Sequence, residues 1–170
     1  MQRKMILAMD LDGCIGKNDG LPWRLRADML RFKRLTVGEG NNTVLMGRTT
    51  WESLPEAYRP LDERLNIIVT RNEEYTIEGA RTCSSIEIGL NLAEENSSDI
   101  CWIIGGANVY EQCRDVVDEI HLTMVETNKS GDVRVGLFSE NDWEYEVIET
   151  VHADDKNEHE STYMILRRRS

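Results

Sequence analysis

Met5-Ile6-Leu7-Ala8-Met9 is a continuous apolar run, which is typical of a β-strand buried on both faces. Residues 11–24 follow with three glycines and a proline, so they predict a long loop directly after a central strand. Long loops beside a rigid strand often carry functional residues. The start of the chain therefore predicts a sheet with a site at one end of its central strand.

Beyond this strand, strand and helix patterns alternate along the chain. We expect strands at 43–46, 65–69, 100–104 and 117–125, and helices at 25–36, 48–54, 86–95 and 107–115. This alternation predicts a parallel sheet with right-handed crossovers. Residues 143–152 and 161–167 have alternating polarity, and a polar stretch separates them, which predicts an antiparallel hairpin at the sheet edge. The expected fold is an α/β three-layer sandwich with a mostly parallel central sheet and a C-terminal edge hairpin, formed by one domain over residues 1–170.

The composition limits the partners of the protein. The 170 residues carry 31 acidic and 20 basic side chains, for a net charge of -11. This acidic balance argues against binding to nucleic acid or to an anionic membrane. Residues 24–71, in contrast, contain nine basic and six acidic residues, and they include eight of the 15 arginines. The sequence thus predicts a local basic cleft for a small polyanion.

The four cysteines have no C-x-x-C spacing, and with three histidines they give no zinc motif. Cys101 and Cys113 are expected to be buried thiols in a reducing compartment. The apolar stretch that ends at Asp10 is too short for a signal peptide or a membrane span. We therefore expect a cytoplasmic monomer without a metal.

Two glycine-containing strand ends suit a phosphate-bearing ligand, because ligands of open α/β sheets bind beyond the carboxyl ends of strands. In Val44-Leu45-Met46-Gly47-Arg48-Thr49-Thr50, the glycine permits a tight turn and Arg48 lies at the following helix start. The alternative is a helix start capped by threonine. Gly105-Gly106 lets backbone approach a ligand closely, but paired glycines also serve plain turns, and the G-x-G-x-x-G motif is absent.

Val69-Thr70-Arg71 is a third polar strand end, and Arg71 could reach an anion that the Arg48 helix holds. Alone, Arg71 would more often be a solvated surface residue. Two arginines and two helix starts together favour a dinucleotide with an additional phosphate, so we predict NADP(H) rather than NAD(H).

Asp28 and Phe32 share one face of the helix expected at 25–36, and Leu25, Met29 and Leu35 extend an apolar stripe there. A carboxylate beside apolar side chains is costly unless it has a partner. Asp28 is either a ligand for a protonatable heterocycle, with Phe32 stacked on the ring, or a first-turn residue stabilised by the helix dipole.

Arg64 precedes a strand and could pair with a substrate carboxylate. The alternative is a salt bridge to Asp62 or Glu63, although residues so close in sequence usually pair poorly.

Trp23 is either a wall of the pocket or a core residue.

Together these motifs resemble the dihydrofolate reductase family from about residue 5 to residue 168. The similar segments are the active-site loop with Ile15-Gly16 and Gly20-Leu21-Pro22-Trp23, the substrate helix with Ala27-Asp28 and Phe32-Lys33, and the cofactor motifs at 46–53 and 104–110.

The resemblance implies reduction of 7,8-dihydrofolate to 5,6,7,8-tetrahydrofolate, by hydride transfer from NADPH to C6 and protonation at N5, in support of one-carbon and thymidylate metabolism. It implies that Asp28 binds N3 and the 2-amino group of the pterin as the pocket's only ionisable group, and that it promotes N5 protonation through water. Thr123 is implied to hydrogen-bond this carboxylate. Leu21 is implied to close over the nicotinamide and exclude water.

The resemblance also implies two sets of contacts. The substrate set is Ile6, Asp28, Phe32, Lys33, Arg59, Arg64 and Ile104, in which Ile6 and Ile104 offer backbone carbonyls and Arg64 holds a glutamate carboxylate. The cofactor set is Ala8, Ile15, Gly16, Gly20, Gly47, Arg48, Thr49, Thr50, Thr70, Arg71, Gly105, Gly106, Ala107, Asn108, Val109 and Tyr110. The Gly105-Gly106 peptide matches a cis bond of the family.

Residues 131–138 and 55–59 depart from the family pattern, the latter by lengthening the segment before Pro60. One alternative function is the pyrimidine reductase of riboflavin synthesis, which shares the fold but lacks a Leu-Pro-Trp loop paired with an aspartate on the next helix. The other is a non-catalytic NADP-binding protein.

Overall fold

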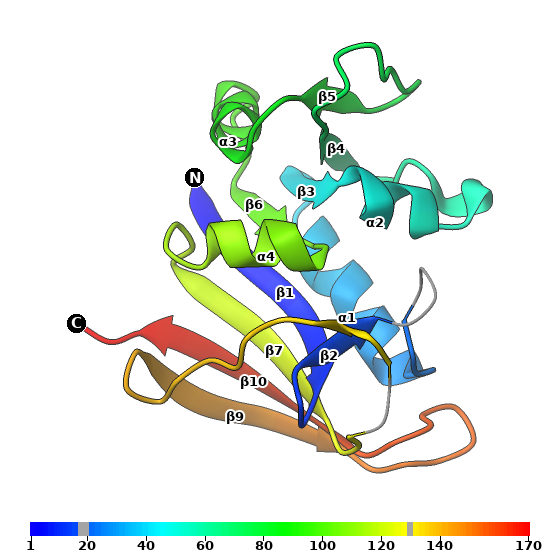
Figure 1. Cartoon of the computed structure of the whole chain (residues 1–170), viewed down its shortest axis with the longest axis vertical. Coiled ribbons are helices and arrows are strands. Elements are labelled where there is room, and N and C mark those ends of the chain that lie inside the picture. Colours follow the sequence, from blue (N-terminus) through cyan, green and yellow to red (C-terminus); the bar gives the residue numbers. More distant parts are fainter. Residues whose placement is uncertain (17–20, 129–130) are drawn as a thin grey trace.

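The computed structural model describes residues 1–16, 21–128 and 131–170 (Figure 1). The strands of its main sheet are β1 (Gln2–Asp10), β3 (Asn42–Gly47), β4 (Arg64–Val69), β5 (Arg81–Cys83), β6 (Ile100–Ile103), β7 (Glu119–Val125), β9 (Trp143–Val151) and β10 (Ser161–Arg168). The helices are α1 (Arg26–Val37), α2 (Arg48–Ser53), α3 (Ile86–Glu95), α4 (Ala107–Cys113) and the short 3-10 helix η1 (Glu56–Tyr58). A separate small ribbon pairs β2 (Cys14–Gly16) with β8 (Val133–Arg134).

In the described part of the chain, the main sheet has eight strands in the order β5-β4-β3-β6-β1-β7-β10-β9. Every pair from β5 to β7 is parallel, whereas β10 is antiparallel to both β7 and β9. The predicted parallel sheet with an antiparallel C-terminal hairpin at its edge is confirmed.

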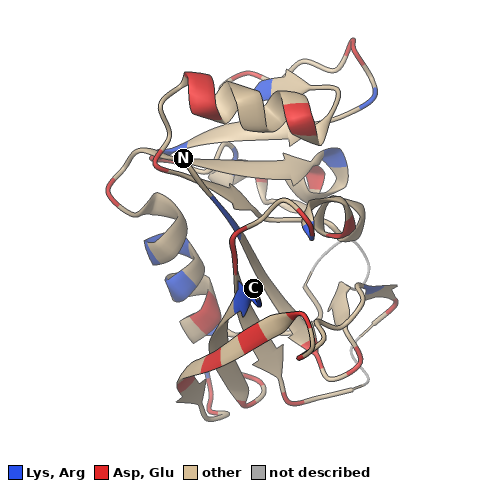
Figure 2. Ribbon diagram, turned by 90° about the vertical axis from the view of Figure 1, so that its left-hand side faces the viewer, with Lys and Arg blue, Asp and Glu red and all other residues tan. Residues whose placement is uncertain are grey.

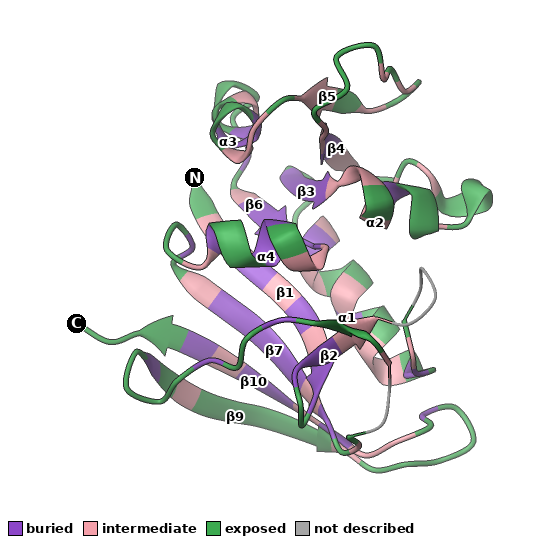
Figure 3. Cartoon of the chain, in the orientation of Figure 1, coloured by how far each residue is buried: buried purple, intermediate pink, exposed green. Residues whose placement is uncertain are grey.

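Alternate side chains of β1 pack on opposite faces of the sheet, as expected for a strand of period 2. Met5, Leu7 and Met9 lie in a core cluster with side chains of α3 and α4. Ile6 packs against a second cluster that includes side chains of α1 and α2. Helices therefore cover both faces, and the three-layer prediction is confirmed (Figure 3).

The predicted boundaries are accurate to within about two residues. The helix predicted at 86–95 has the observed bounds, but the helix predicted at 107–115 ends at Cys113 and the strand predicted at 117–125 begins at Glu119. A turn closes this helix, since the Val116 and Val117 amides both donate to the Cys113 carbonyl. Cys101 and Cys113 are buried free thiols, as predicted.

The outer strand β9 is solvated. Most of its residues are exposed. Acidic residues, red in Figure 2, recur along this strand. None of the helices in the described ranges has the length and apolar character needed to cross a membrane.

Gly13 fixes the turn between β1 and β2, and its replacement should destabilise the fold. Gly13 and Gly40 both have positive φ angles, of 82° and 90°. A Cβ atom on Gly13 would also overlap the backbone carbonyl of Val135, whereas one on Gly40 would meet nothing within 4 Å. We expect Gly40→Ala to lower the free energy of unfolding by about 1 kcal/mol, and Gly13→Ala by about 3 kcal/mol. Urea denaturation of both variants measures the difference, and equal losses would contradict the role given to the Val135 contact.

Candidate active site

The site begins with Asp28 in the first turn of α1 and Thr123 in β7. The Thr123 hydroxyl donates a hydrogen bond to Asp28 Oδ1 at 2.6 Å. Thr123 lies beside Ala8 in the sheet register, so this contact places the carboxylate next to the central strand. The structure therefore brings together two of the predicted catalytic residues.

Residues of the segment between β9 and β10 hydrogen-bond to the first backbone amides of α1. Asn157 Oδ1 accepts a hydrogen bond from the Ala27 amide at 3.0 Å, and the Lys156 carbonyl accepts one from the Arg26 amide. These contacts satisfy amide groups that have no partner within the helix. The polar stretch between β9 and β10 thus helps to position Asp28.

The electrostatic environment of Asp28 is mixed. Burial raises the pKa of its carboxyl group, while the Thr123 hydrogen bond and the charge of Arg31 act in the lowering direction. Arg31 Nη1 lies 3.5 Å from Asp28 Oδ1. Arg31 therefore brings a positive charge next to this carboxylate.

Apolar side chains pack between α1 and the sheet. Phe32, one turn after Asp28 on α1, and Ile6 both pack against the cluster that contains Ile104. The Ile6 carbonyl, expected to face a pterin, accepts a hydrogen bond from the Tyr110 hydroxyl at 2.8 Å. Met29, which was predicted in the same apolar stripe of α1, is 60% exposed.

The predicted cofactor motifs meet where β3 and β6 end. The Gly47 amide donates to the Gly105 carbonyl at 2.8 Å, and the Gly105-Gly106 peptide is cis, as the resemblance implied. A Cβ atom on Gly47 would approach Val109, and one on Gly106 would approach Thr50, both at 3.2 Å. Close packing against the Val109 and Thr50 side chains thus disfavours a Cβ atom at these two positions.

Arg48 is held in place at this edge. Its Nε atom lies 2.8 Å from Glu52 Oε1, and its guanidinium stacks 3.9 Å above the Tyr75 ring. Gly47, which directly precedes Arg48, pairs with Val69 in the sheet register. The exposed Arg71 follows Val69 by two residues, so it lies just beyond the end of β4, on the strand next to the one that leads into α2. The structure brings Arg48 and Arg71 to adjacent strand ends, and these residues fit an additional phosphate.

Arg64 lies at the beginning of β4 and has local partners. Its Nη2 is 3.2 Å from Asp62 Oδ1, its Nε donates to the Asp62 carbonyl, and its Nη1 donates to Thr36 Oγ1. The expectation that neighbouring acids pair poorly is therefore wrong. Glu63 has a φ of 60°, and this left-handed residue turns the chain so that Asp62 faces Arg64.

Arg59 and Lys33 are the other charged residues of the predicted substrate set. Arg59 stacks over Trp51 and approaches Glu56 at 3.6 Å, and Lys33 is exposed on α1. Lys33 does line a surface hollow beside α1 with Glu63.

The predicted loop residues are only partly described. Leu21 is 62% exposed, while Trp23 is buried against Leu25 and Val125, which favours the core alternative for Trp23. Gly20 lies outside the described residues. Ile15 and Gly16 belong to β2, beside β1.

The sequence does not single out three residues that the structure brings together here. Arg31 lies beside the carboxylate, and Glu149 and Tyr163 contact Arg31. The spacing of Asp28 and Arg31 on one helix, three positions apart, was an available signal for the first. Glu149 and Tyr163 lie in the hairpin strands β9 and β10. They come close to Arg31 only because β10 pairs with β7 and β9 pairs with β10 in the sheet.

An α/β sheet with a half-buried carboxylate and arginines at adjacent strand ends fits a reductase that uses a nicotinamide dinucleotide with an additional phosphate. The family model for dihydrofolate reductase matches residues 3–168, so the chain belongs to the dihydrofolate reductase family. This membership confirms the predicted class, an NADPH-dependent oxidoreductase.

Individual relatives agree with this assignment. Dihydrofolate reductase of Bacillus subtilis is 31% identical over 165 residues, covering 97% of this chain and 94% of the relative. The Mycobacterium leprae dihydrofolate reductase is 37% identical over 123 residues, 72% of each protein. Enterococcus faecalis dihydrofolate reductase, solved in complex with NADP(H) and RAB-propyl, superposes with a TM-score of 0.84 at 30% identity, covering 99% of this chain and 97% of that one.

Proposed function

We propose that this chain is a single-domain, cytoplasmic, monomeric enzyme that reduces 7,8-dihydrofolate to 5,6,7,8-tetrahydrofolate with NADPH, in support of one-carbon and thymidylate metabolism. The observation that carries the proposal is the Thr123–Asp28 contact of 2.6 Å, which fixes a largely buried carboxylate beside the central strand. In this family context, such a carboxylate suits the paired N–H donors of a pterin.

The residues at the edge of β3 and β6 fit the cofactor. A Cβ atom on glycine 47, 105 or 106 would lie 3.2 Å from a neighbouring side chain, so the absence of Cβ atoms permits the close packing of this edge, and Arg48 is already oriented by Glu52. NADPH, when bound, supplies the hydride that C6 of dihydrofolate accepts. Arg48 and Arg71 would hold the additional phosphate, and Thr49 and Thr50 would hold the pyrophosphate.

Asp28 binds and orients the substrate by accepting hydrogen bonds from N3–H and the 2-amino group, one on each carboxylate oxygen, while Oδ1 also accepts from Thr123. As C6 gains the hydride, the electrons of the C6=N5 double bond move to N5, which takes a proton delivered by water. The carboxylate favours that protonation by placing negative charge near the ring. Leu21 belongs to the loop that excludes bulk water from the reaction.

Arg64→Gln tests the predicted role of Arg64 at the glutamate carboxylate. A charge-assisted hydrogen bond contributes about 1.5–3 kcal/mol, so we expect KM for dihydrofolate to rise about 10-fold or more. Steady-state kinetics with a substrate analogue that lacks the glutamate provide the control. An equal rise in KM for the analogue would show that Arg64 acts only through its structural contacts with Asp62 and Thr36.

A direct assay tests the proposed function. Purified protein should oxidise NADPH only when dihydrofolate is added, and it should not do so with the aminopyrimidine substrate of riboflavin synthesis. NADPH oxidation with the aminopyrimidine alone would favour the alternative reductase. Cofactor binding without turnover of either substrate would favour a non-catalytic protein.

A further inference from the structure

Arg31 is a buried arginine on the active-site helix. Only 4% of its surface is exposed, and its Nη1 atom lies 3.5 Å from Asp28 Oδ1. A buried guanidinium is costly unless it is paired. Its position next to the substrate-binding carboxylate therefore needs a physical explanation.

Two further contacts fix the guanidinium from the C-terminal hairpin. Its Nη2 atom donates to Glu149 Oε2 of β9 at 2.8 Å. Its plane stacks on the Tyr163 ring of β10, with 4.3 Å between Cζ and the ring centroid. Arg31 thus connects α1 to the antiparallel edge of the sheet.

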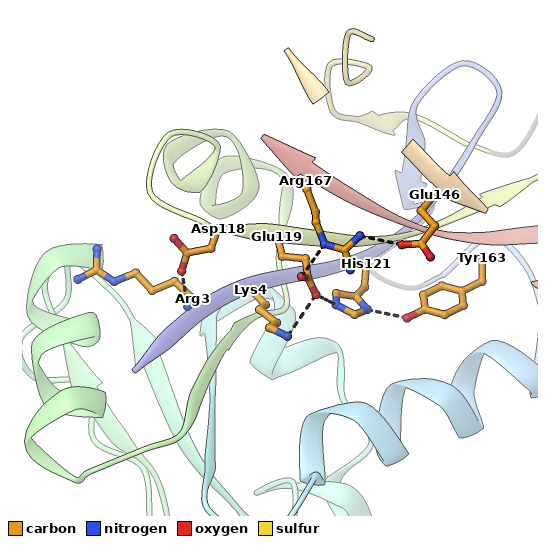
Figure 4. A network of polar contacts seen from close by, with 8 residues as sticks. All are labelled: Arg3, Lys4, Asp118, Glu119, His121, Glu146, Tyr163 and Arg167. Carbon is orange, nitrogen blue, oxygen red and sulfur yellow. Dashed lines mark hydrogen bonds and ion pairs between the residues drawn. The ribbon is translucent and has the colours of Figure 1, made fainter. Parts of the chain in front are cut away.

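The Tyr163 ring is itself held by a polar network (Figure 4). Its hydroxyl lies 2.6 Å from His121 Nδ1, and His121 Nε2 lies 2.6 Å from Glu119 Oε1. Burial is the main cause that lowers the pKa of His121. With a neutral imidazole, Tyr163 donates to Nδ1 and Nε2–H donates to Glu119, so the ring beneath Arg31 has a fixed orientation.

The contact between Arg31 and Asp28 is electrostatic. Among the described residues, Arg31 Nη1 is buried and has no hydrogen-bond partner, while Thr123 already donates to the same carboxylate oxygen. Arg31 therefore acts on Asp28 through its charge. The opposite charge of Glu149, which is 57% exposed in its side chain, moderates that effect.

Of the described residues, Thr123 and Tyr110 also interact with Asp28, and neither carries a charge. Thr123 of β7 is uncharged. Tyr110 of α4 stays neutral, because burial and then the Asp28 charge raise the pKa of its hydroxyl. Tyr163 of β10 also has a raised pKa, mainly from burial.

We propose that Arg31 is a positioning residue of the active site, whose guanidinium, fixed by Glu149 and Tyr163, stabilises the ionised Asp28 carboxylate against its burial and extends to lower pH the range in which the enzyme binds its substrate. This inference rests on the proposed function for its catalytic consequence. Burial favours the protonated carboxyl group, and the positive charge of Arg31 opposes that effect. Without the Arg31 charge, the effect of burial on the pKa of Asp28 is opposed less strongly. Asp28 must then take up its proton at a higher pH.

The test is a carbon NMR titration of the Asp28 carboxyl group in the free protein, with three variants. Arg31→Met should move the titration midpoint to higher pH. Glu149→Gln should move it to lower pH, because the Arg31 charge is then less neutralised. Arg34→Met, which removes an exposed charge from the same helix, should leave it unchanged.

Kinetics give a second readout, since the pH profile of kcat/KM reports the essential groups of the free enzyme. The acid limb of the kcat/KM profile should move in the same direction as the NMR midpoint in each variant. Arg31→Lys keeps the positive charge, so its limb and its midpoint should lie close to those of the unmodified protein. An unchanged midpoint in both Arg31→Met and Glu149→Gln would overturn the inference. The NMR midpoint needs no turnover, so its failure is distinguishable from a failure of the proposed reaction.

Discussion

Asp28→Asn should lower kcat/KM for dihydrofolate by at least about 100-fold near neutral pH, the scale expected for loss of a group that assists proton transfer. The amide cannot accept both N–H donors of the pterin, and it places no negative charge near N5. Steady-state kinetics give the loss, and a fluorescence titration with NADPH should show nearly unchanged cofactor binding.

Asp12→Asn is the matched control, because Asp12 is an exposed acid in the turn that follows β1. It should retain the kinetics of the unmodified protein. An Asp28→Asn enzyme with unaltered kcat/KM would contradict the role assigned to the carboxylate.

Arg48→Ala combined with Arg71→Ala should weaken NADPH binding by about 100-fold or more, because two charge-assisted hydrogen bonds of about 1.5–3 kcal/mol each are lost. NADH lacks the additional phosphate, so its dissociation constant should change less than about 3-fold. Calorimetric titration with both cofactors measures the two effects.

Arg81→Ala removes an exposed arginine from the neighbouring strand β5 and serves as the charge control. It should leave the ratio of NADPH to NADH affinity unchanged. An equal loss of affinity for both cofactors in the double variant would show that Arg48 and Arg71 do not hold the phosphate.

The helices and strands of four or more residues could be predicted, because burial alone sets their patterns of apolar residues. β1 and β6 are apolar on both faces, and Ile86–Glu95 has a helical stripe that matches its observed bounds. The strands β5, β2 and β8 have two or three residues each and gave no pattern of their own. They become strands only through pairing with β4 or with each other.

The same distinction applies to the site. Asp28, Thr123, Arg48 and the glycine turns lie in recognisable motifs, and their placement could be predicted. The Arg64–Asp62 pair depends on a left-handed Glu63, and the contacts of Arg31 with Glu149 and Tyr163 depend on how the terminal hairpin packs behind α1. Neither follows from local patterns.

Hydride transfer to C6 is the central claim, and isotope transfer tests it most directly. NADPH that carries deuterium at the reactive position of the nicotinamide should yield tetrahydrofolate with one deuterium at C6, in a one-to-one ratio to NADP formed. Oxidation of the cofactor without deuterium at C6 of a folate product would contradict the account.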